Sequence, residues 1–255
     1  MKCKKIVLGY VPVMRDTFPV APARQMRDRI RARVDEILQG NEHIELADAA
    51  PLLPDGMLWD NADVEKVAAF LEEKHADALF LPHCNFGQEE AAAKLAARLG
   101  RPVLLWGPRD PAPEGLNFRP LDIQCGLFAT SKALVRYGVP FTYLENCNLD
   151  SEILAEGLDR FARTVAVVKA MRGMRVGQIG LRPRQFLSVK VNESELLEKF
   201  GIEVTPIWTE EITTVVAKLR SGNADKIGRV QKIELPMATK RLGTLEDRGP
   251  DPSIR

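Results

Sequence analysis

The segment LPHCNFGQEE, residues 81–90, places a histidine, a cysteine and an asparagine at three consecutive positions. Such residues could bind a metal ion, supply a nucleophilic thiolate, or hydrogen-bond to a small polar ligand. An apolar run precedes them, and a glycine followed by acidic residues comes after. This pattern is typical of a loop between a buried strand and a helix, and it predicts that residues 83–86 lie in such a loop.

The metal and nucleophile hypotheses each lack partners in the sequence. A metal site needs three or four ligands at short spacing or on facing elements, which His83 and Cys84 do not supply. His43 falls in a predicted loop and His75 at a predicted helix terminus, where its charge would complement the helix dipole. A reactive Cys84 or Cys125 would need a nearby base, but His83 points away from Cys84 if both continue the strand. The sequence favours neither chemistry, and we expect no metal ligands and no catalytic residue in this chain.

The composition excludes several classes of partner. The 255 residues include 36 Lys and Arg against 35 Asp and Glu, so no basic surface for nucleic acid or anionic membrane is indicated. No apolar run approaches the roughly 18 residues of a membrane span, and no signal peptide precedes the first predicted strand. We therefore expect a cytoplasmic protein. Its cysteines form no CxxC pair, which favours free thiols over a disulfide framework: Cys3, Cys84, Cys125 and Cys147.

Short apolar runs alternate with helical patterns through the first two thirds of the chain. This alternation predicts right-handed βαβ crossovers, and hence a Rossmann- or flavodoxin-like α/β domain with a parallel sheet over residues 1–172. The predicted strands are residues 5–13, 44–46, 78–81, 102–106 and 140–144. The predicted helices are residues 26–38, 61–71, 88–99, 126–137 and 151–172.

The carboxyl ends of those strands are where ligands bind in open parallel sheets. Hydrogen-bond donors beside the face of an aromatic ring suit a polyhydroxylated ligand such as a sugar. No GxGxxG or GxxxxGK[ST] loop follows a strand, so nucleotide phosphates are not indicated, and the GxxG of RVGQIG is better explained by close packing in a strand. An ordinary loop explains the same residues and stays open as the alternative. The rim residues are Arg15, Asn85, Gln88 and Arg109, with Phe86 and Trp106 nearby.

A second unit begins near residue 173. Strands at 175–181 and 202–207 flank a helix that Asn192 and Glu195 would cap, and a helix follows Thr209. Two strands and two helices are too few to cover the edges of a parallel sheet. Residues 173–222 therefore read as the start of an incomplete second α/β domain, and residues 223–255 as a weakly structured tail.

Three blocks of sequence carry a family resemblance. They are HCNFGQEEAAAKLAARLGRPVLLWGPRD, then QCGLFATSKALVRYGVPFTYLENC, then RVGQIGLRPRQFLSV with NESELLEKFGIEVTPI. In this order they resemble the amino-terminal half of the L-fucose/L-arabinose isomerase family, from about residue 5 to residue 210. The resemblance implies aldose–ketose isomerisation with Mn²⁺ or a similar divalent ion, whose Glu, Asp and His ligands lie in sequence that this chain does not contain. It also implies a trimer-based hexamer.

The resemblance assigns sugar contacts to specific positions. Arg15 matches the arginine after the first strand, and Cys84, Asn85 and Phe86 occupy the loop after the third strand, where the Asn-Phe pair departs from relatives with tryptophan. Leu121 and Ile123 stand where the family motif RDTQCG has arginine and threonine, so a polar contact is lost. The assigned substrate-binding residues are thus Arg15, Cys84, Asn85 and Phe86.

Two functions follow from these expectations. The first is a fucose/arabinose isomerase-like chain, truncated or split, that is inactive by itself because it lacks the metal ligands. The second is a non-catalytic sugar-binding or assembly subunit. The expected partners are a sugar and either further copies of the chain or a separate carboxy-terminal half, without nucleic acid or membrane.

Overall fold

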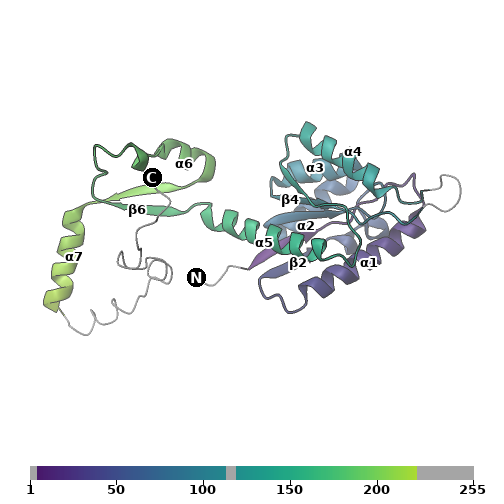
Figure 1. Ribbon diagram of the computed structural model, residues 1–255, viewed down its shortest axis with the longest axis horizontal. Coiled ribbons are helices and arrows are strands. Elements are labelled where there is room, and N and C mark those ends of the chain that lie inside the picture. The colour runs from purple at the N-terminus through teal and green to yellow at the C-terminus, as the bar shows by residue number, and fades with distance from the viewer. Residues whose placement is uncertain (1–4, 113–118, 223–255) are drawn as a thin grey trace, which may run out of the picture. The chain divides into compact units, whose positions relative to one another are not determined.

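The computed structural model describes residues 5–112 and 119–222, which fall into two compact units (Figure 1). The first unit runs to Ala170, and the second begins at Met171. The predicted tail, residues 223–255, lies outside the described residues. No helix in the described ranges is both long and apolar enough to cross a membrane.

The first unit is built on a five-stranded parallel sheet in the order β2-β1-β3-β4-β5, which confirms the predicted fold class. Every residue of β3 and β4 is buried, as expected for central strands covered on both faces. The chain moves from β1 to β2 in one direction and then returns past β1 to β3. The topological switch point therefore lies between β1 and β3, where such sheets bind their ligands. The strands are β1 (Ile6–Tyr10), β2 (Ile44–Asp48), β3 (Ala78–Pro82), β4 (Val103–Trp106) and β5 (Phe141–Tyr143).

Helices cover both faces of this sheet (Figure 1). On one face, the Arg31 guanidinium of α1 lies over the Tyr10 ring, and Arg33 of α1 donates to the Leu149 carbonyl just before α5. On the other face, Leu71 of α2 packs against Gly9 of β1, and α2, α3 and α4 contact one another in sequence order. The helices are α1 (Val20–Leu38), α2 (Val64–Glu73), α3 (Glu89–Leu99), α4 (Ile123–Arg136) and α5 (Glu152–Met171).

Several predicted boundaries were wrong, and each has a local reason. Helix α1 begins at Val20 rather than residue 26, because Pro22 lies in the first turn, where no backbone donor is needed. Helix α4 begins at Ile123 rather than residue 126, because the Asp110 carboxylate accepts hydrogen bonds from the first backbone N–H groups of the helix. Strand β1 ends at Tyr10, and residues 11–13 continue as irregular backbone. Short 3₁₀ turns at Ala50–Leu52, Pro54–Gly56 and Asn61–Asp63 precede α2.

The second unit has a two-stranded parallel sheet, β6 (Arg175–Ile179) paired with β7 (Glu203–Ile207). Helix α6 (Glu193–Phe200) joins them after a 3₁₀ turn at Leu187–Val189, and α7 (Thr209–Gly222) follows β7. The Asn192 side chain accepts a hydrogen bond from Glu195 N, which confirms the predicted cap. Within residues 171–222, Ile202 is the only buried hydrophobic residue.

An ion pair fastens the last turns of α5 to the amino end of the first sheet. One Asp77 carboxylate oxygen accepts hydrogen bonds from Val7 N at 2.8 Å and from Lys169 Nζ at 2.7 Å. The same ammonium group donates to the Lys5 carbonyl at 3.2 Å. The Asp77 side chain is only 15% exposed, so water does little to replace these bonds. The pair therefore joins α5, β1 and the segment before β3.

Replacing Asp77 with Ala should lower the free energy of unfolding by about 2 kcal/mol, because Val7 N and Lys169 lose their partner in a half-buried site. Lys94→Ala is the matched control, since it removes an exposed i,i+4 pair with Glu90 that contributes little to stability. Urea unfolding followed by tryptophan fluorescence measures both. Equal midpoints for the two variants would contradict the assigned role of Asp77.

Candidate functional site

The loops after β1 and β3 are joined at the switch point by the side chain of Asn85. Its Oδ1 accepts hydrogen bonds from Arg15 N at 2.8 Å and from Gly87 N at 3.1 Å, and its Nδ2 donates to the Arg15 carbonyl at 3.1 Å. Asn85 is completely buried. Its amide therefore fixes the backbone on both sides of the rim, with both of its polar atoms already paired.

The Arg15 side chain lies across the loop that Asn85 fixes. Arg15 Nε donates to the Gly87 carbonyl at 3.1 Å, and the guanidinium carbon lies 4.5 Å from the centre of the Phe86 ring. The Phe18 ring stacks on Phe86 with centroids 5.4 Å apart, and Arg15 Nη2 reaches Gln88 Oε1 at 3.5 Å. Arg15 keeps 25% of its side chain exposed. The rim thus presents a preorganised cation beside an aromatic pair.

His83 supports the same loop from inside the protein. Its Nδ1 lies 3.0 Å from the Phe86 carbonyl, which can only accept, so Nδ1 carries the proton. Nε2 is buried and has no hydrogen-bond partner within the described residues. Burial lowers the pKa of His83 to about 4, with smaller opposing contributions from the hydrogen bonds to the Phe86 and Asn85 backbone. The imidazole is therefore neutral at pH 7 and acts as a support rather than as a proton donor to a ligand.

Two glycines allow the loop to fit against its neighbours. Gly87 has φ +81°, and a Cβ at this position would overlap the His83 imidazole. Gly126 in the first turn of α4 lies so close to the loop that a Cβ would overlap the Phe86 carbonyl oxygen. Helix α4 therefore forms the back of the 83–87 loop, and no larger residue fits at either position.

The strand ends next to this loop are held by side-chain amide and carboxylate groups. Asn146 Nδ2 donates to the Gly107 and Pro108 carbonyls at 2.8 and 2.9 Å. Arg109 N donates to the Cys147 carbonyl, and the Arg109 side chain is exposed. Asp110 is used as the cap of α4. These bonds give the rim a rigid backbone after β4 and β5.

The predicted site residues differ in how far their side chains are exposed to solvent. Arg15 and Phe86 are partly exposed, whereas Cys84 and Asn85 are completely buried. Burial raises the pKa of the Cys84 thiol well above its ordinary value, so the thiolate form is disfavoured. Trp106, predicted near the rim, is fully buried in the core. Phe18 was missed by the sequence reasoning, although an aromatic residue three positions after Arg15 was a usable signal.

The residues of this rim do not fit the divalent ion that the family resemblance implies. His83 has one nitrogen committed to Phe86 and the other enclosed, and Cys84 is protonated. In residues 5–112 and 119–222, no group of three or more His, Cys, Asp or Glu side chains is placed to hold a metal ion. The rim therefore offers no set of ligands for such an ion within the described residues.

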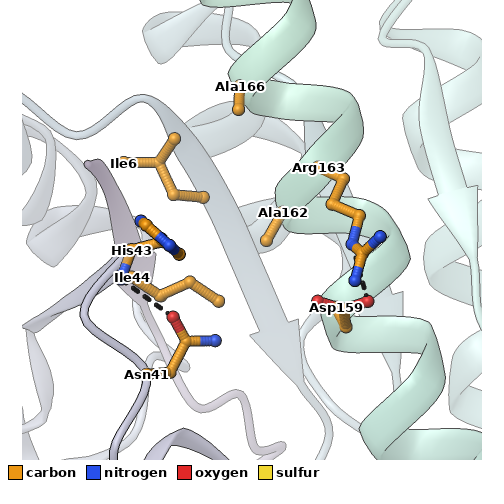
Figure 2. Close-up of a pocket in the computed structure, with 8 residues that line it drawn as sticks. All are labelled: Ile6, Asn41, His43, Ile44, Asp159, Ala162, Arg163 and Ala166. Atoms are coloured by element: carbon orange, nitrogen blue, oxygen red, sulfur yellow. Dashed lines mark hydrogen bonds and ion pairs between the residues drawn. The ribbon is translucent and has the colours of Figure 1, made fainter. Parts of the chain in front are cut away.

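A separate pocket lies at the opposite, amino end of the sheet (Figure 2). Ile6 and Ile44 face Ala162 and Ala166 of α5 across a hollow of about 340 Å³. Its polar wall consists of Asn41, His43 and an exposed ion pair between Arg163 and Asp159. None of the predicted sugar-contacting residues lines this pocket.

The fold is that of a parallel α/β protein, and the rim at the switch point of its sheet is its candidate ligand site. Residues 9–172 match the family described as the N-terminal domain of fucose/sulfoquinovose isomerases, and the chain belongs to this family. The match confirms the resemblance to fucose isomerases and extends it to enzymes of sulfoquinovose.

Curated relatives carry the name sulfoquinovose isomerase. The protein from Priestia megaterium is 27% identical over 228 residues, which make up 88% of this chain and 47% of the relative. The protein from Alkalicoccus urumqiensis is 28% identical over 234 residues, 85% of this chain and 49% of the relative. A third, from a Clostridium species, is 25% identical over 150 residues. The chain thus spans about half the length of the first two.

Replacing Gly126 with Ala should destabilise the protein by about 2–3 kcal/mol, because the new methyl group must displace the Phe86 backbone. At an ordinary helix position the same change stabilises a protein by about 1 kcal/mol. The sign of the change in unfolding free energy therefore tests whether the Phe86 backbone lies this close to Gly126. Gly157→Ala in α5 is the control, since the new Cβ would overlap the Leu144 side chain, which can shift, rather than backbone, which cannot. Urea midpoints give the comparison, and a stabilised Gly126→Ala variant would contradict the packing described.

The buried neutral His83 should make stability depend on pH. Its pKa is about 4 when folded and about 6.5 when unfolded, so its contribution is complete above pH 6.5 and is lost as pH falls toward 4. Unfolding free energy should fall by about 2 kcal/mol between pH 7.5 and pH 5 through this group. Urea titrations of the wild type and of His83→Asn at both pH values measure the difference. The same pH dependence in both proteins would rule out this role of His83.

Proposed function

We propose that this chain forms one wall of the sugar site of an aldose–ketose isomerase of the fucose/sulfoquinovose isomerase type. Membership of the family and the names of the relatives support the reaction class. The chain does not turn over sugar by itself in this proposal, because the described residues include no fitting set of metal ligands. Mn²⁺ or a similar ion, and the ligands that hold it, would come from another polypeptide segment.

The observation that carries the proposal is the fixed position of Arg15 at the switch point. Its Nε and Nη2 are bonded to the loop, while Nη1 has no hydrogen-bond partner among the described residues. A sugar can therefore accept from Nη1 and lay its C–H face near Phe86. A guanidinium held in advance loses little conformational entropy when a ligand binds.

The four predicted substrate-binding residues take different roles in this proposal. Arg15 and Phe86 contact the sugar, because both are partly exposed at the rim. Asn85 is a positioning residue, since its amide is already satisfied by the Arg15 and Gly87 backbone. Cys84 lies behind the wall and contributes packing, and Leu121 and Ile123 are buried apolar residues.

Sulfoquinovose is the sugar to test first, because the relatives are named for it. Its sulfonate is a permanent anion that a guanidinium binds through charge-assisted hydrogen bonds. L-Fucose is neutral and offers only hydroxyl groups to the same side chain. Arg15 Nη2 also lies 3.9 Å from a Glu89 carboxylate oxygen, so a sulfonate would compete with Glu89 for the guanidinium. A preference for the sulfonated sugar requires that the sulfonate wins this competition.

A non-catalytic sugar-binding or assembly subunit is the second candidate. The observation in its favour is that the rim is fully built while His83 and Cys84 are held in unreactive states. Exposed Phe128 and Val135 on the outer side of α4 favour association of several copies in either case. Both candidates place the protein in the cytoplasm. Mn²⁺-dependent turnover by an assembled complex distinguishes them.

Substituting Arg15 with Ala should weaken binding of sulfoquinovose at least tenfold, because the fixed donor and the charge are both lost. The affinity of Arg15→Lys should lie between those of the wild type and Arg15→Ala, because lysine keeps the charge and loses the planar contact with Phe86. Arg98→Ala is the control, because Arg98 pairs with Glu65 and Glu72 on the surface of α2 and α3. Isothermal titration calorimetry of the purified chain measures each affinity.

Two outcomes would contradict the proposal. An unchanged sugar affinity in Arg15→Ala would show that Arg15 does not contact the sugar. Isomerisation of sulfoquinovose or L-fucose by the purified chain with Mn²⁺, above the rate of the metal alone, would overturn its inactivity in isolation.

A further inference from the structure

The Arg15 guanidinium has a carboxylate beside it before any ligand binds. Arg15 Nη2 lies 3.9 Å from a Glu89 carboxylate oxygen and 3.5 Å from Gln88 Oε1. Glu89 is the first residue of α3, where the helix dipole favours an acidic side chain. Its side chain is 40% exposed, so it can change its position without disturbing the core. The positive charge of the rim is therefore partly neutralised, and Glu89 does this from the Nη2 side.

Neutral and anionic ligands meet this carboxylate in different ways. A sugar hydroxyl can accept from the free Nη1 of Arg15 while Nη2 keeps its contacts with Gln88 and Glu89. An anionic group on the same guanidinium would lie beside the Glu89 carboxylate, and like charges at such short range repel each other. A charge-assisted bond from Arg15 to an anion therefore requires that the Glu89 side chain turns away.

A second positive surface lies where Glu89 can reach it. A hollow of about 340 Å³ between α3 and α4 is lined by Glu89 and Glu90 on one side and by Lys132 and Arg136 on the other. Glu90 is paired with Lys94 of its own helix at 2.6 Å. Lys132 and Arg136 are exposed, lie one helical turn apart, and form no ion pair with another described residue. These two cations are thus available to a carboxylate that leaves Arg15.

We propose that Glu89 determines the charge of the sugars that the Arg15 rim accepts. In the free protein its carboxylate stays beside Arg15, and the rim favours neutral ligands. An anionic group binds when Glu89 turns into the hollow, where Lys132 and Arg136 neutralise its charge. Glu89 acts through Arg15 and is a positioning residue. The inference rests on the proposed function, because it specifies which sugars the Arg15 wall takes.

The test is Glu89→Gln, which keeps the size of the side chain and an acceptor oxygen but removes the charge. NMR titrations followed at the Arg15 Nε–Hε signal measure the affinities for methanesulfonate, sulfoquinovose and L-fucose. The variant should bind both sulfonates about threefold more tightly or better, and the gain should shrink at high salt, because the effect is electrostatic. Its affinity for L-fucose should change by less than about twofold, since a neutral sugar leaves Glu89 in place.

Glu90→Gln is the matched control, because it makes the same change of charge in the same turn of α3. Glu90 is paired with Lys94 rather than with Arg15, so this variant should keep all three affinities of the wild type. Equal methanesulfonate affinities in the wild type and Glu89→Gln would overturn the inference. So would a gain of the same size in Glu90→Gln, since the effect would then not be specific to the carboxylate beside Arg15.

A double-mutant cycle tests the role of the two cations on α4. Replacing both Lys132 and Arg136 with Ala should weaken methanesulfonate binding about twofold or more in the wild type, because the displaced Glu89 loses its partners. The same replacement should have no effect in Glu89→Gln. An equal loss of affinity in both backgrounds would show that the cations act on the anion directly, and would contradict the proposed movement of Glu89.

This inference and the proposed function fail in different ways. Methanesulfonate reports on the charge around Arg15 without requiring that the rim binds sugar. If Arg15→Ala kept the sugar affinity of the wild type while Glu89→Gln still bound methanesulfonate more tightly, the proposed sugar site would be wrong, and the control of anion binding by Glu89 would stand.

Discussion

The candidate site depends on one buried amide. Asn85 bonds the Arg15 backbone through both its oxygen and its nitrogen, and it also holds Gly87. These bonds connect the loops after β1 and β3, the two strands on either side of the topological switch. Together with the backbone hydrogen bonds from Val13 N to the Pro82 carbonyl and from Cys84 N to the Val13 carbonyl, they hold the backbone that carries Arg15 over Phe86.

Packing behind the loop makes this geometry rigid. His83 fills the space beneath Gly87 and bonds the Phe86 carbonyl, while Gly126 allows α4 to touch the same carbonyl. A neutral histidine and two glycines thus set the shape of the loop from behind. Burial disfavours the charged form of both His83 and Cys84, and both side chains pack behind the loop.

Much of the fold could be predicted from sequence because its signals are local. Alternating apolar runs and helical stripes indicated all five strands of the first sheet, and Asn192 indicated the start of α6. The start of α4 could not be predicted in this way, because its cap comes from Asp110, on the far side of residues 113–118. Likewise, the sequence placed Asn85 at the rim but could not show that its amide faces inward, since that depends on pairing between loops seventy residues apart.

The most direct test of the central claim is an NMR titration of the isotope-labelled chain with sulfoquinovose, followed at the Arg15 Nε–Hε and Phe86 amide signals. The account predicts that these signals move together and saturate, while the signals of His43 and Arg163 at the opposite pocket stay unchanged. Shifts confined to residues 41–44 and 159–166, with Arg15 and Phe86 unaffected at saturating sugar, would contradict it.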